Sequence, residues 1–438
     1  LPPTFVPLFH NEAAVRRMRY SRLGNTDLLV SQLGLGCGPI GGLFGDVEDS
    51  ITQVVETALR DGVNLIDTAY WYGQARSESI LGKVLCKVPR SAYFICTKVG
   101  RFELDFVRSF DFRADKILES LMESLKRLRL TYIDVAFLQL HDFDFEANAG
   151  IVLFETLQAL EMAKLSGKIR YIGITGYSLT KVVRVVEESS VLVDVVMSYC
   201  HGTLNDNSLG RYTSFFKSRG IGLLNGSPLS MGLLTQRGPP PWHPANETIR
   251  EAVAAAVDYC VSKGISIERL ALDYSVSFPE CAACLIGLSS IAHVRAAIEL
   301  VTERGLSELE QRVRYRIMRR YLDSLENASW EGLDPAKYWK RLKKLGLPTL
   351  ATHRHSSVES LASTLNGLSL RSTTSSSDLR SSSRMSRNSQ QRTPSGPRSR
   401  SFFLRLSGKR HLSHIFSPIY YHREIYNNFT LFHSIYIL

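Results

Sequence analysis

Short apolar runs alternate along the chain with longer amphipathic stretches. The runs have the length of buried strands, and the stretches between them place apolar residues three and four positions apart, as helices do. Strands are expected at residues 33–37, 63–67, 93–98, 133–140, 169–174, 194–200, 221–226 and 283–287. Helices are expected at residues 50–61, 77–86, 115–128, 149–166, 179–188, 208–218, 248–263 and 291–301. Eight strand–helix units in about 270 residues predict an α/β fold, a closed parallel (β/α)8 TIM barrel rather than an open sheet.

Further segments precede and follow this repeat. Two short alternating runs within residues 19–36 flank Gly24-Asn25-Thr26-Asp27, which predicts an N-terminal β-hairpin. The amphipathic segments Ile267–Phe278 and Leu306–Leu322 are expected to be extra helices outside the barrel. Trp330–Pro348 is expected either to cross the barrel mouth or pack on its wall, with simple surface packing an equal alternative. The predicted organisation is an N-terminal extension at 1–18, the barrel at 19–348 and a C-terminal tail at 349–438.

The composition changes sharply after residue 350. Residues 351–410 hold 18 serines in 60 positions and few large apolar side chains, so the tail is expected to be disordered. Residues 411–438 are rich in Tyr, Ile, Phe and His, and we interpret them as a gene-model read-through, with a short segment for an unknown protein partner as the alternative. The chain starts at Leu1 rather than Met, which suggests an incomplete or trimmed N-terminus.

The net charge of +11 is concentrated in the tail. Of 53 Lys and Arg, 12 lie in residues 351–438, against 3 of 42 Asp and Glu, so residues 1–350 carry only about +2. The tail lacks regular Arg-Ser repeats and aromatic stacking residues. A nucleic-acid partner is therefore not expected, and the tail is interpreted as an appendage that phosphorylation could tune.

The seven cysteines are odd in number and scattered through apolar runs, which favours reduced thiols in the cytoplasm. Cys281 and Cys284 form the single close pair, and incidental cysteines are favoured over a metal or redox site, so no metal is expected. Residues 1–10 do not resemble a signal peptide, and no run of about 18 apolar residues predicts a membrane span.

Ionisable side chains end three successive predicted strands. Asp67 follows the second strand, with Tyr72 five residues later, while Lys98 and His141 end the third and fourth. The C-terminal ends of the strands are where a barrel carries its chemistry. Each residue alone is more often structural, but four together predict a proton-transfer site. Tyr72 is expected to exchange the proton with its pKa lowered by Lys98, Asp67 to hold Lys98, and His141 to orient the substrate oxygen.

With these residues in place, the chain resembles the aldo-keto reductases over residues 19–345. The motifs that carry the resemblance are Arg22-Leu23-Gly24, Val30-Ser31-Gln32-Leu33-Gly34-Leu35-Gly36, Asp67-Thr68-Ala69-x-x-Tyr72-Gly73, Lys98, His141, Gly167-Lys168-Ile169-Arg170-Tyr171-Ile172-Gly173 and Ser227-Pro228-Leu229. The resemblance implies a (β/α)8 barrel, a nicotinamide cofactor across its C-terminal face, reversible carbonyl reduction, and Asp67, Tyr72, Lys98 and His141 as the catalytic tetrad.

The versions at Gly173–Tyr177, Ser198–His201 and Ser227–Thr235 are similar to the L-galactose dehydrogenase branch of that family. Three positions depart from the common pattern. Thr175-Gly176 replaces a Ser-Asn pair that grips the carboxamide, Ser198 replaces a glutamine, and Gly226 replaces an aromatic that stacks on the nicotinamide. The cofactor contacts implied by the resemblance are Gly38, Thr175, Ser198, Ser227, Leu229, Gly287, Ser289, Ser290 and His293.

The stretch Gly287–Ala297 matches the family's loop and helix start that hold the adenosine phosphate, where a helix N-terminus favours an anion. His293 stands at the arginine that usually binds a 2′-phosphate, and Arg295 follows two residues on, so the resemblance favours NAD over NADP. The expected function is an NAD(P)-dependent oxidoreductase, similar to L-galactose dehydrogenase, that interconverts a carbonyl and an alcohol. The carbonyl compound is expected to be an aldehyde or to belong to an aldose/lactone pair. The alternatives are a cofactor-binding regulatory barrel without a metabolic substrate and a general aldehyde or ketone reductase.

Overall fold

A closed barrel of eight parallel strands forms the centre of the protein. The computed structural model describes residues 1–42, 50–102, 109–140, 149–240, 243, 245–303, 305–330 and 340. Its barrel strands, in the order β10-β3-β4-β5-β6-β7-β8-β9, close because β10 pairs with β3. Their bounds are β3 Leu33–Gly36, β4 Leu65–Asp67, β5 Phe94–Val99, β6 Ile133–Gln139, β7 Ile169–Gly176, β8 Val195–Tyr199, β9 Gly222–Gly226 and β10 Ala283–Gly287. The predicted (β/α)8 fold is confirmed.

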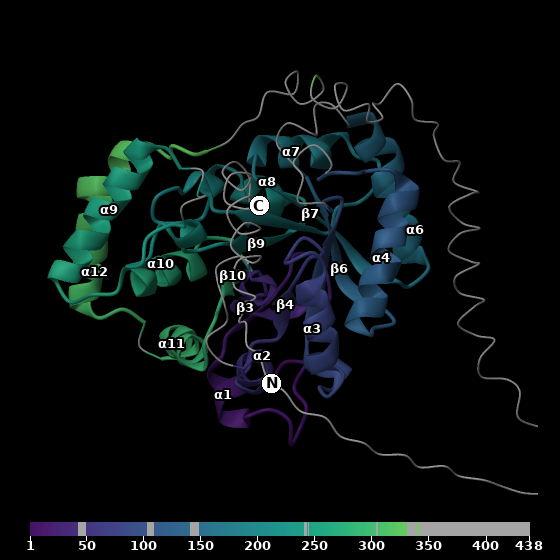
Figure 1. The fold of residues 1–438 in the computed structure, drawn as a ribbon, viewed down its shortest axis with the longest axis horizontal. Helices are drawn as coiled ribbons and strands as arrows, with labels where there is room; N and C mark the ends of the chain where they lie inside the picture. The colour runs from purple at the N-terminus through teal and green to yellow at the C-terminus, as the bar shows by residue number, and fades with distance from the viewer. Residues whose placement is uncertain are drawn as a thin grey trace, which may run out of the picture.

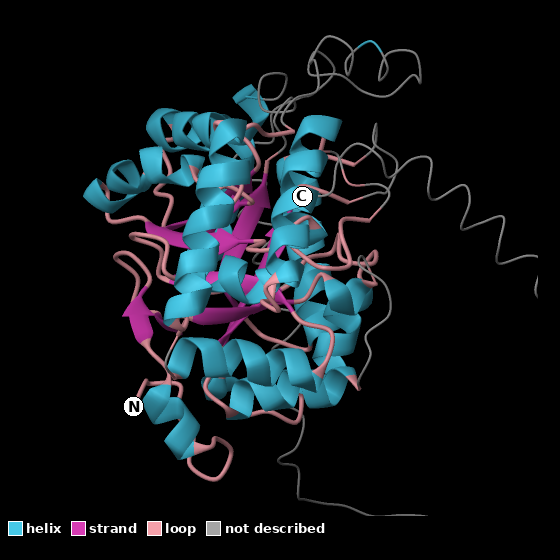
Figure 2. Cartoon of the chain, turned by 90° about the vertical axis from the view of Figure 1, so that its left-hand side faces the viewer, coloured by secondary structure: helices cyan, strands magenta, loops and turns pink. Residues whose placement is uncertain are grey.

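Helices cover the outside of the barrel (Figures 1 and 2). They are α1 Glu12–Arg17, α2 Ile51–Arg60, α3 Arg76–Leu85, α4 Ala114–Leu128, α6 Leu157–Leu165, α7 Leu179–Glu188, α8 Thr213–Ser218, α9 Glu247–Ser262, α10 Ile267–Val276, α11 Ile291–Thr302 and α12 Glu308–Ile317. The extra helices predicted after residue 266 are present as α10 and α12, and α12 lies beside α9 (Figure 1).

Several helical regions differ from the predicted pattern. The end of the helix expected at 306–322 forms the π-helix η6 Met318–Leu322. The helix expected at 149–166 contains the π-helix η3 Val152–Thr156 before α6 begins. The helix expected at 208–218 is split into the 3-10 helix η4 Ser208–Arg211 and α8. Helix α1, inside the expected extension, was not predicted, and it is capped by the Asn11 side chain, which accepts a hydrogen bond from the Ala14 N–H. Apolar periodicity does not reveal these local changes of hydrogen bonding.

The predicted hairpin is present as β1 Tyr20–Arg22 and β2 Leu29–Ser31, which pair antiparallel. Its Leu23, Leu28 and Val30 are fully buried and belong to the same apolar cluster as Leu65, Phe94, Val135 and Val195, which come from the first halves of barrel strands. The hairpin therefore closes the N-terminal end of the barrel with apolar side chains. Arg170 holds the hairpin turn through ion pairs with Asp27 and with the buried Asp134.

Several expectations fall outside the described residues. The tail at 349–438 and most of Trp330–Pro348 are among them. Within the described ranges, no helix is long and apolar enough to span a membrane. The same ranges contain no cluster of three or more His, Cys, Asp or Glu that could hold a metal, and all seven cysteines, including Cys281 and Cys284, are free thiols.

Candidate active site

Asp67, Tyr72 and Lys98 meet at the C-terminal end of the barrel. Alternation along the strands turns Asp67 of β4 and Lys98 of β5 to the inner face, because each lies two residues after a barrel-interior side chain. The Lys98 Nζ donates to both carboxylate oxygens of Asp67, at 2.7 and 2.6 Å, and to the Tyr72 hydroxyl at 3.1 Å. The Tyr72 hydroxyl in turn donates to Asp67 at 3.3 Å. Three of the four residues of the predicted tetrad are thus in mutual contact.

A tight loop carries Tyr72 into this contact. Gly73 has φ +69°, and a Cβ there would lie 2.3 Å from the Gly41 carbonyl oxygen. A Cβ on Gly41 would in turn lie 2.5 Å from the Tyr72 carbonyl carbon. Two glycines therefore let the 3-10 helix η1 Pro39–Gly41 approach the backbone of Tyr72 directly. This close approach fixes the loop against the segment that follows β3.

Burial dominates the electrostatics of the cluster. Asp67 and Lys98 are buried, and desolvation raises the pKa of Asp67 while the Lys98 ammonium lowers it. Desolvation and the Asp67 carboxylate raise the pKa of Tyr72 well above its usual value of 10.0. The predicted lowering of the Tyr72 pKa by Lys98 is therefore not the net result in this arrangement. Tyr72 is a protonated phenol at neutral pH, which is the form that donates a proton to a carbonyl oxygen.

The fourth predicted residue, His141, follows β6 and lies outside the described residues. The described part of the cluster borders a small cavity of about 10 Å³, lined by Tyr72, Lys98, Gln139, Thr175, Gly176, Met197 and Tyr199. Gln139 was not predicted as a site residue. Its signal in the sequence is its polarity at the end of an apolar strand.

Three predicted cofactor contacts lie around β7, β8 and β9. Thr175 lines the cavity, but its hydroxyl donates to the Met197 carbonyl at 3.0 Å. Ser198 does not line the cavity: its hydroxyl is buried without a hydrogen-bond partner among the described atoms, and its neighbours Met197 and Tyr199 face the cavity instead. Gly226 pairs with Tyr199, whose ring lies 3.6 Å from where a Cβ on Gly226 would be. An aromatic wall is therefore supplied by β8, beside the glycine.

The loop after β9 carries Ser227 and Leu229. Ser227, Ser230 and Met231 have φ values of +59°, +47° and +54°, which non-glycine residues rarely adopt. The Ser227 hydroxyl accepts from the Met231 N–H at 3.1 Å, and its side chain also hydrogen-bonds the Tyr199 hydroxyl. Leu229 is half-buried against the outer core, which is the apolar cluster formed by the barrel strands and the surrounding helices. Backbone strain of this kind is concentrated at functional sites, which fits the place of this loop at the barrel's C-terminal end.

The remaining predicted contacts gather where β10 leads into α11. Gly287 ends β10 beside Pro39, which lies 2.8 Å from the position of a Cβ on Gly287, while Gly38 precedes η1 on the same side. Ser290 is the N-cap of α11, and its hydroxyl accepts from the His293 N–H at 3.1 Å. Ser289 lies 3.3 Å from the His293 ring nitrogen Nδ1, and both His293 and Arg295 are exposed.

Trp330 reaches the same end of the barrel. Its ring stacks on Tyr177, after β7, at 5.6 Å, and meets His243 edge-on at 4.8 Å. Its backbone N–H donates to the Tyr177 hydroxyl at 3.4 Å. The chain after α12 therefore returns to the loops around the candidate site at Trp330, and the rest of Trp330–Pro348 that would decide between crossing the mouth and lining the wall is not described.

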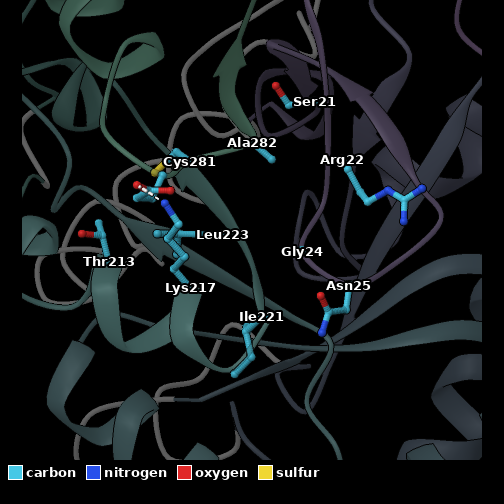
Figure 3. Close-up of a pocket in the computed structure, with 12 residues that line it drawn as sticks. Ser21, Arg22, Gly24, Asn25, Thr213, Lys217, Ile221, Leu223, Cys281 and Ala282 are labelled. Atoms are coloured by element: carbon cyan, nitrogen blue, oxygen red, sulfur yellow. Dashed lines mark hydrogen bonds and ion pairs between the residues drawn. The ribbon is translucent and has the colours of Figure 1, made fainter.

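A larger cavity, of about 420 Å³, lies near the hairpin at the N-terminal end of the barrel (Figure 3). It is bordered by the hairpin, α8 and the chain before β10. Lys217 on its wall pairs with Glu280 at 2.8 Å, and Arg22 points away from Lys217. This cavity is remote from Asp67, Tyr72 and Lys98, so size alone does not identify the site of chemistry.

Comparison with known proteins identifies the family of the chain. Residues 32–311 match the aldo/keto reductase family. The chain belongs to the aldo-keto reductase family. It is 42% identical to the L-galactose dehydrogenase of Arabidopsis thaliana over 312 residues, which cover 70% of this chain and 95% of that protein. It is 31% identical to the D-arabinose 1-dehydrogenase of Saccharomyces cerevisiae, over 63% of this chain and 85% of that protein.

Solved structures show the same architecture. The aldo-keto reductase AKR11C1 from Bacillus halodurans, in its holo form, is 26% identical, has a TM-score of 0.56, and covers 68% of this chain and 96% of its own. The glycerol dehydrogenase AKR11B4 from Gluconobacter oxydans, at 22% identity and a TM-score of 0.55, shares the fold over 72% of this chain and 98% of its own. The protein is therefore an oxidoreductase of a family that uses nicotinamide cofactors.

Proposed function

We propose that this aldo-keto reductase oxidises an aldose at its anomeric carbon to the lactone, with L-galactose as the first candidate and NAD as the preferred cofactor. The observation that carries the proposal is the contact of Tyr72 with the buried Asp67–Lys98 pair at the barrel's C-terminal end. The substrate class is taken from the name of the 42% identical relative. The match covers 95% of that relative.

The geometry of the cluster supports these proposed roles. Tyr72 exchanges the proton with the substrate oxygen: the phenol donates it in carbonyl reduction, and the phenolate accepts it in alcohol oxidation. Lys98 hydrogen-bonds that hydroxyl and is held by both oxygens of Asp67, which fixes its position. We assign His141 to the orientation of the substrate oxygen, from its place at the end of the next strand.

The residues at the start of α11 fit a dinucleotide phosphate. The helix is twelve residues long, its first turn offers backbone N–H groups, and Ser289 and Ser290 stand beside them. Gly38, Thr175, Ser227, Leu229 and Gly287 are the further proposed contacts, whereas Ser198, turned away from the cavity, is left out. When bound, the nicotinamide supplies the hydride acceptor or donor.

The preference for NAD rests on His293 and Arg295. A 2′-phosphate is bound well by a fixed guanidinium, in contacts worth about 1.5–3 kcal/mol. His293 is exposed at the matching position, and Arg295 lies two residues further along the helix, roughly 200° round its axis. We also propose a cytoplasmic location, because all seven cysteines are free thiols, as in a reducing compartment.

A cofactor-reduction assay tests the function. Purified protein is given L-galactose, D-arabinose, glycerol and an aromatic alcohol, each with NAD and with NADP, and reduced cofactor is followed by absorbance. We expect turnover with L-galactose and NAD, and a loss of several orders of magnitude in Tyr72→Phe with the dissociation constant for NAD unchanged. Turnover of the aromatic alcohol alone would favour a general reductase, and a fully active Tyr72→Phe would remove Tyr72 from the mechanism.

A further inference from the structure

A buried histidine–aspartate pair lies at the ends of β7 and β8. His201 comes two residues after β8, and its ring nitrogen Nδ1 donates to the Asp206 carboxylate at 2.8 Å. The other ring nitrogen, Nε2, donates to the backbone carbonyl of Tyr177, the residue after β7, at 2.6 Å. The side chains of His201 and Asp206 are each 3% exposed. Neither residue takes part in the proton transfer proposed above.

The hydrogen bonds around His201 fix its protonation. A backbone carbonyl only accepts, so Nε2 carries a proton. The Ser208 hydroxyl lies 3.2 Å from Nδ1 but gives its own proton to the second oxygen of Asp206, at 2.6 Å, so it faces Nδ1 as an acceptor. Both ring nitrogens therefore donate, and the ring is an imidazolium. Charge-assisted hydrogen bonds are stronger than neutral ones, so the ring is held firmly between the two loops.

The carbonyl that His201 holds belongs to the residue next to the cavity wall. Thr175 and Gly176, the last residues of β7, line the small cavity beside Tyr72. Tyr177 follows them directly, and its ring also lies 4.6 Å from the His201 ring. Because the backbone is continuous, a fixed Tyr177 limits how far Thr175 and Gly176 can move.

The same histidine constrains the end of β8 through its own backbone. Tyr199 lines the cavity two residues before His201. Cys200, between them, has φ +67°, a left-handed conformation that non-glycine residues rarely adopt. Such a conformation persists only where the surrounding contacts impose it. The ion pair of His201 with Asp206 is a contact of this kind.

We propose that His201, paired with Asp206, is a positioning residue that fixes the ends of β7 and β8 and thereby shapes the wall that receives the nicotinamide half of the cofactor. The inference rests on the proposed function, because the hydride must be exchanged beside Tyr72, where the proton is exchanged. The phosphate is proposed to lie at α11, after β10, and β10 is two strands away from β8 in the barrel. His201 should therefore act on one half of the dinucleotide.

A comparison of NAD with ADP-ribose tests this role, because ADP-ribose keeps the adenosine and both phosphates but lacks the nicotinamide. His201→Gln removes the ring and one of its two donors, and Asp206→Asn removes the charge that holds the ring. In both variants we expect the dissociation constant for NAD to rise about tenfold, through the loss of a charge-assisted hydrogen bond. The dissociation constant for ADP-ribose should stay unchanged. Isothermal titration of the purified full-length variants measures both constants.

Asp194→Asn is the matched control, because Asp194 also joins β7 to β8 but at the N-terminal end of the barrel. Its carboxylate pairs with Lys164 at 2.7 Å and accepts from the Ile172 N–H at 2.8 Å. This variant should lower the melting temperature, as the other two should, and leave both dissociation constants at their wild-type values. A selective loss of NAD affinity in Asp194→Asn would overturn the proposal, since the effect would not depend on the end of the strands.

A folded His201→Gln that binds NAD as the wild type does also overturns the proposal. Equal losses for NAD and ADP-ribose overturn it as well, because they would show a general loosening of the fold. If His201→Gln does not fold, the isosteric Asp206→Asn decides by the same two criteria. No sugar enters these measurements. A fully active Tyr72→Phe, or no turnover of L-galactose, would instead overturn the proposed function, so the two failures are distinguishable.

Discussion

His243 is held as a neutral imidazole by two backbone groups. Its Nδ1 accepts a hydrogen bond from the Ala245 N–H at 3.1 Å, so Nε2 carries the proton and donates it to the Ser230 carbonyl at 3.0 Å. A proton added at Nδ1 would break the first of these bonds. Burial accordingly lowers the pKa of His243 from 6.5 to about 4. The residue sits under Trp330, so its charge state bears on how the chain after α12 is anchored.

This histidine predicts a stability that falls in mild acid. Between pH 6.5 and about 4 the unfolded chain binds a proton that the folded chain does not, so the free energy of unfolding should decrease as pH falls through this window. The full effect is about 3 kcal/mol. His243→Gln, which keeps a donor for Ser230, should flatten this part of the dependence in urea unfolding at pH 7.5 and pH 5. Equal losses in both proteins would assign the acid sensitivity to other groups.

At the scale of single residues, the strand-end rule predicted which side chains of the site meet. Asp67, Tyr72 and Lys98 came from that rule. Ser198, which came from the family resemblance, is not among the residues that line the cavity, because alternate side chains of a strand point to opposite sides. The stacking of the Arg101 guanidinium on the Trp71 ring, at 3.9 Å, had no signal in the sequence, because contacts between loops of different strands follow no period.

At the scale of elements, the N-terminus of α11 allows a test of the proposed phosphate site. Ser290 caps α11, and Ser307 caps α12 in a complete capping box. Replacing either serine with alanine should cost about 1 kcal/mol of stability, since each leaves a first-turn N–H without its acceptor. Ser290→Ala should also weaken NAD binding, and Ser307→Ala should not. Melting temperatures and NAD dissociation constants would show it, and equal NAD affinities in both variants would move the phosphate elsewhere.

Elements were the most predictable part of the structure. All eight barrel strands lie within two residues of their expected bounds because buried parallel strands read as uninterrupted apolar runs. The π-helix at Val152–Thr156 and the break between η4 and α8 were missed, since both keep the apolar spacing while the hydrogen bonds change. A single sequence displays the apolar spacing but not these hydrogen bonds.

For the whole molecule, we predict that a chain ending at residue 350 folds and stays active. Residues 1–350 carry almost no net charge, and the last described elements, up to Leu325, are buried against the outer core. The melting temperature and the turnover of the truncated protein should match those of the full chain. A clear drop in either would show that residues 351–438 pack on the barrel.

The hairpin that closes the N-terminal end of the barrel also constrains when the protein can fold. The Asn25 N–H donates to the Gly220 carbonyl at 2.8 Å, and Leu33 pairs with Cys284, so the first strands find their partners only near the end of the barrel sequence. Contacts this distant in sequence slow folding. On the ribosome, Leu23, Leu28 and Val30 emerge long before the strands that bury them. During synthesis these side chains form an exposed apolar surface that chaperones would have to shield.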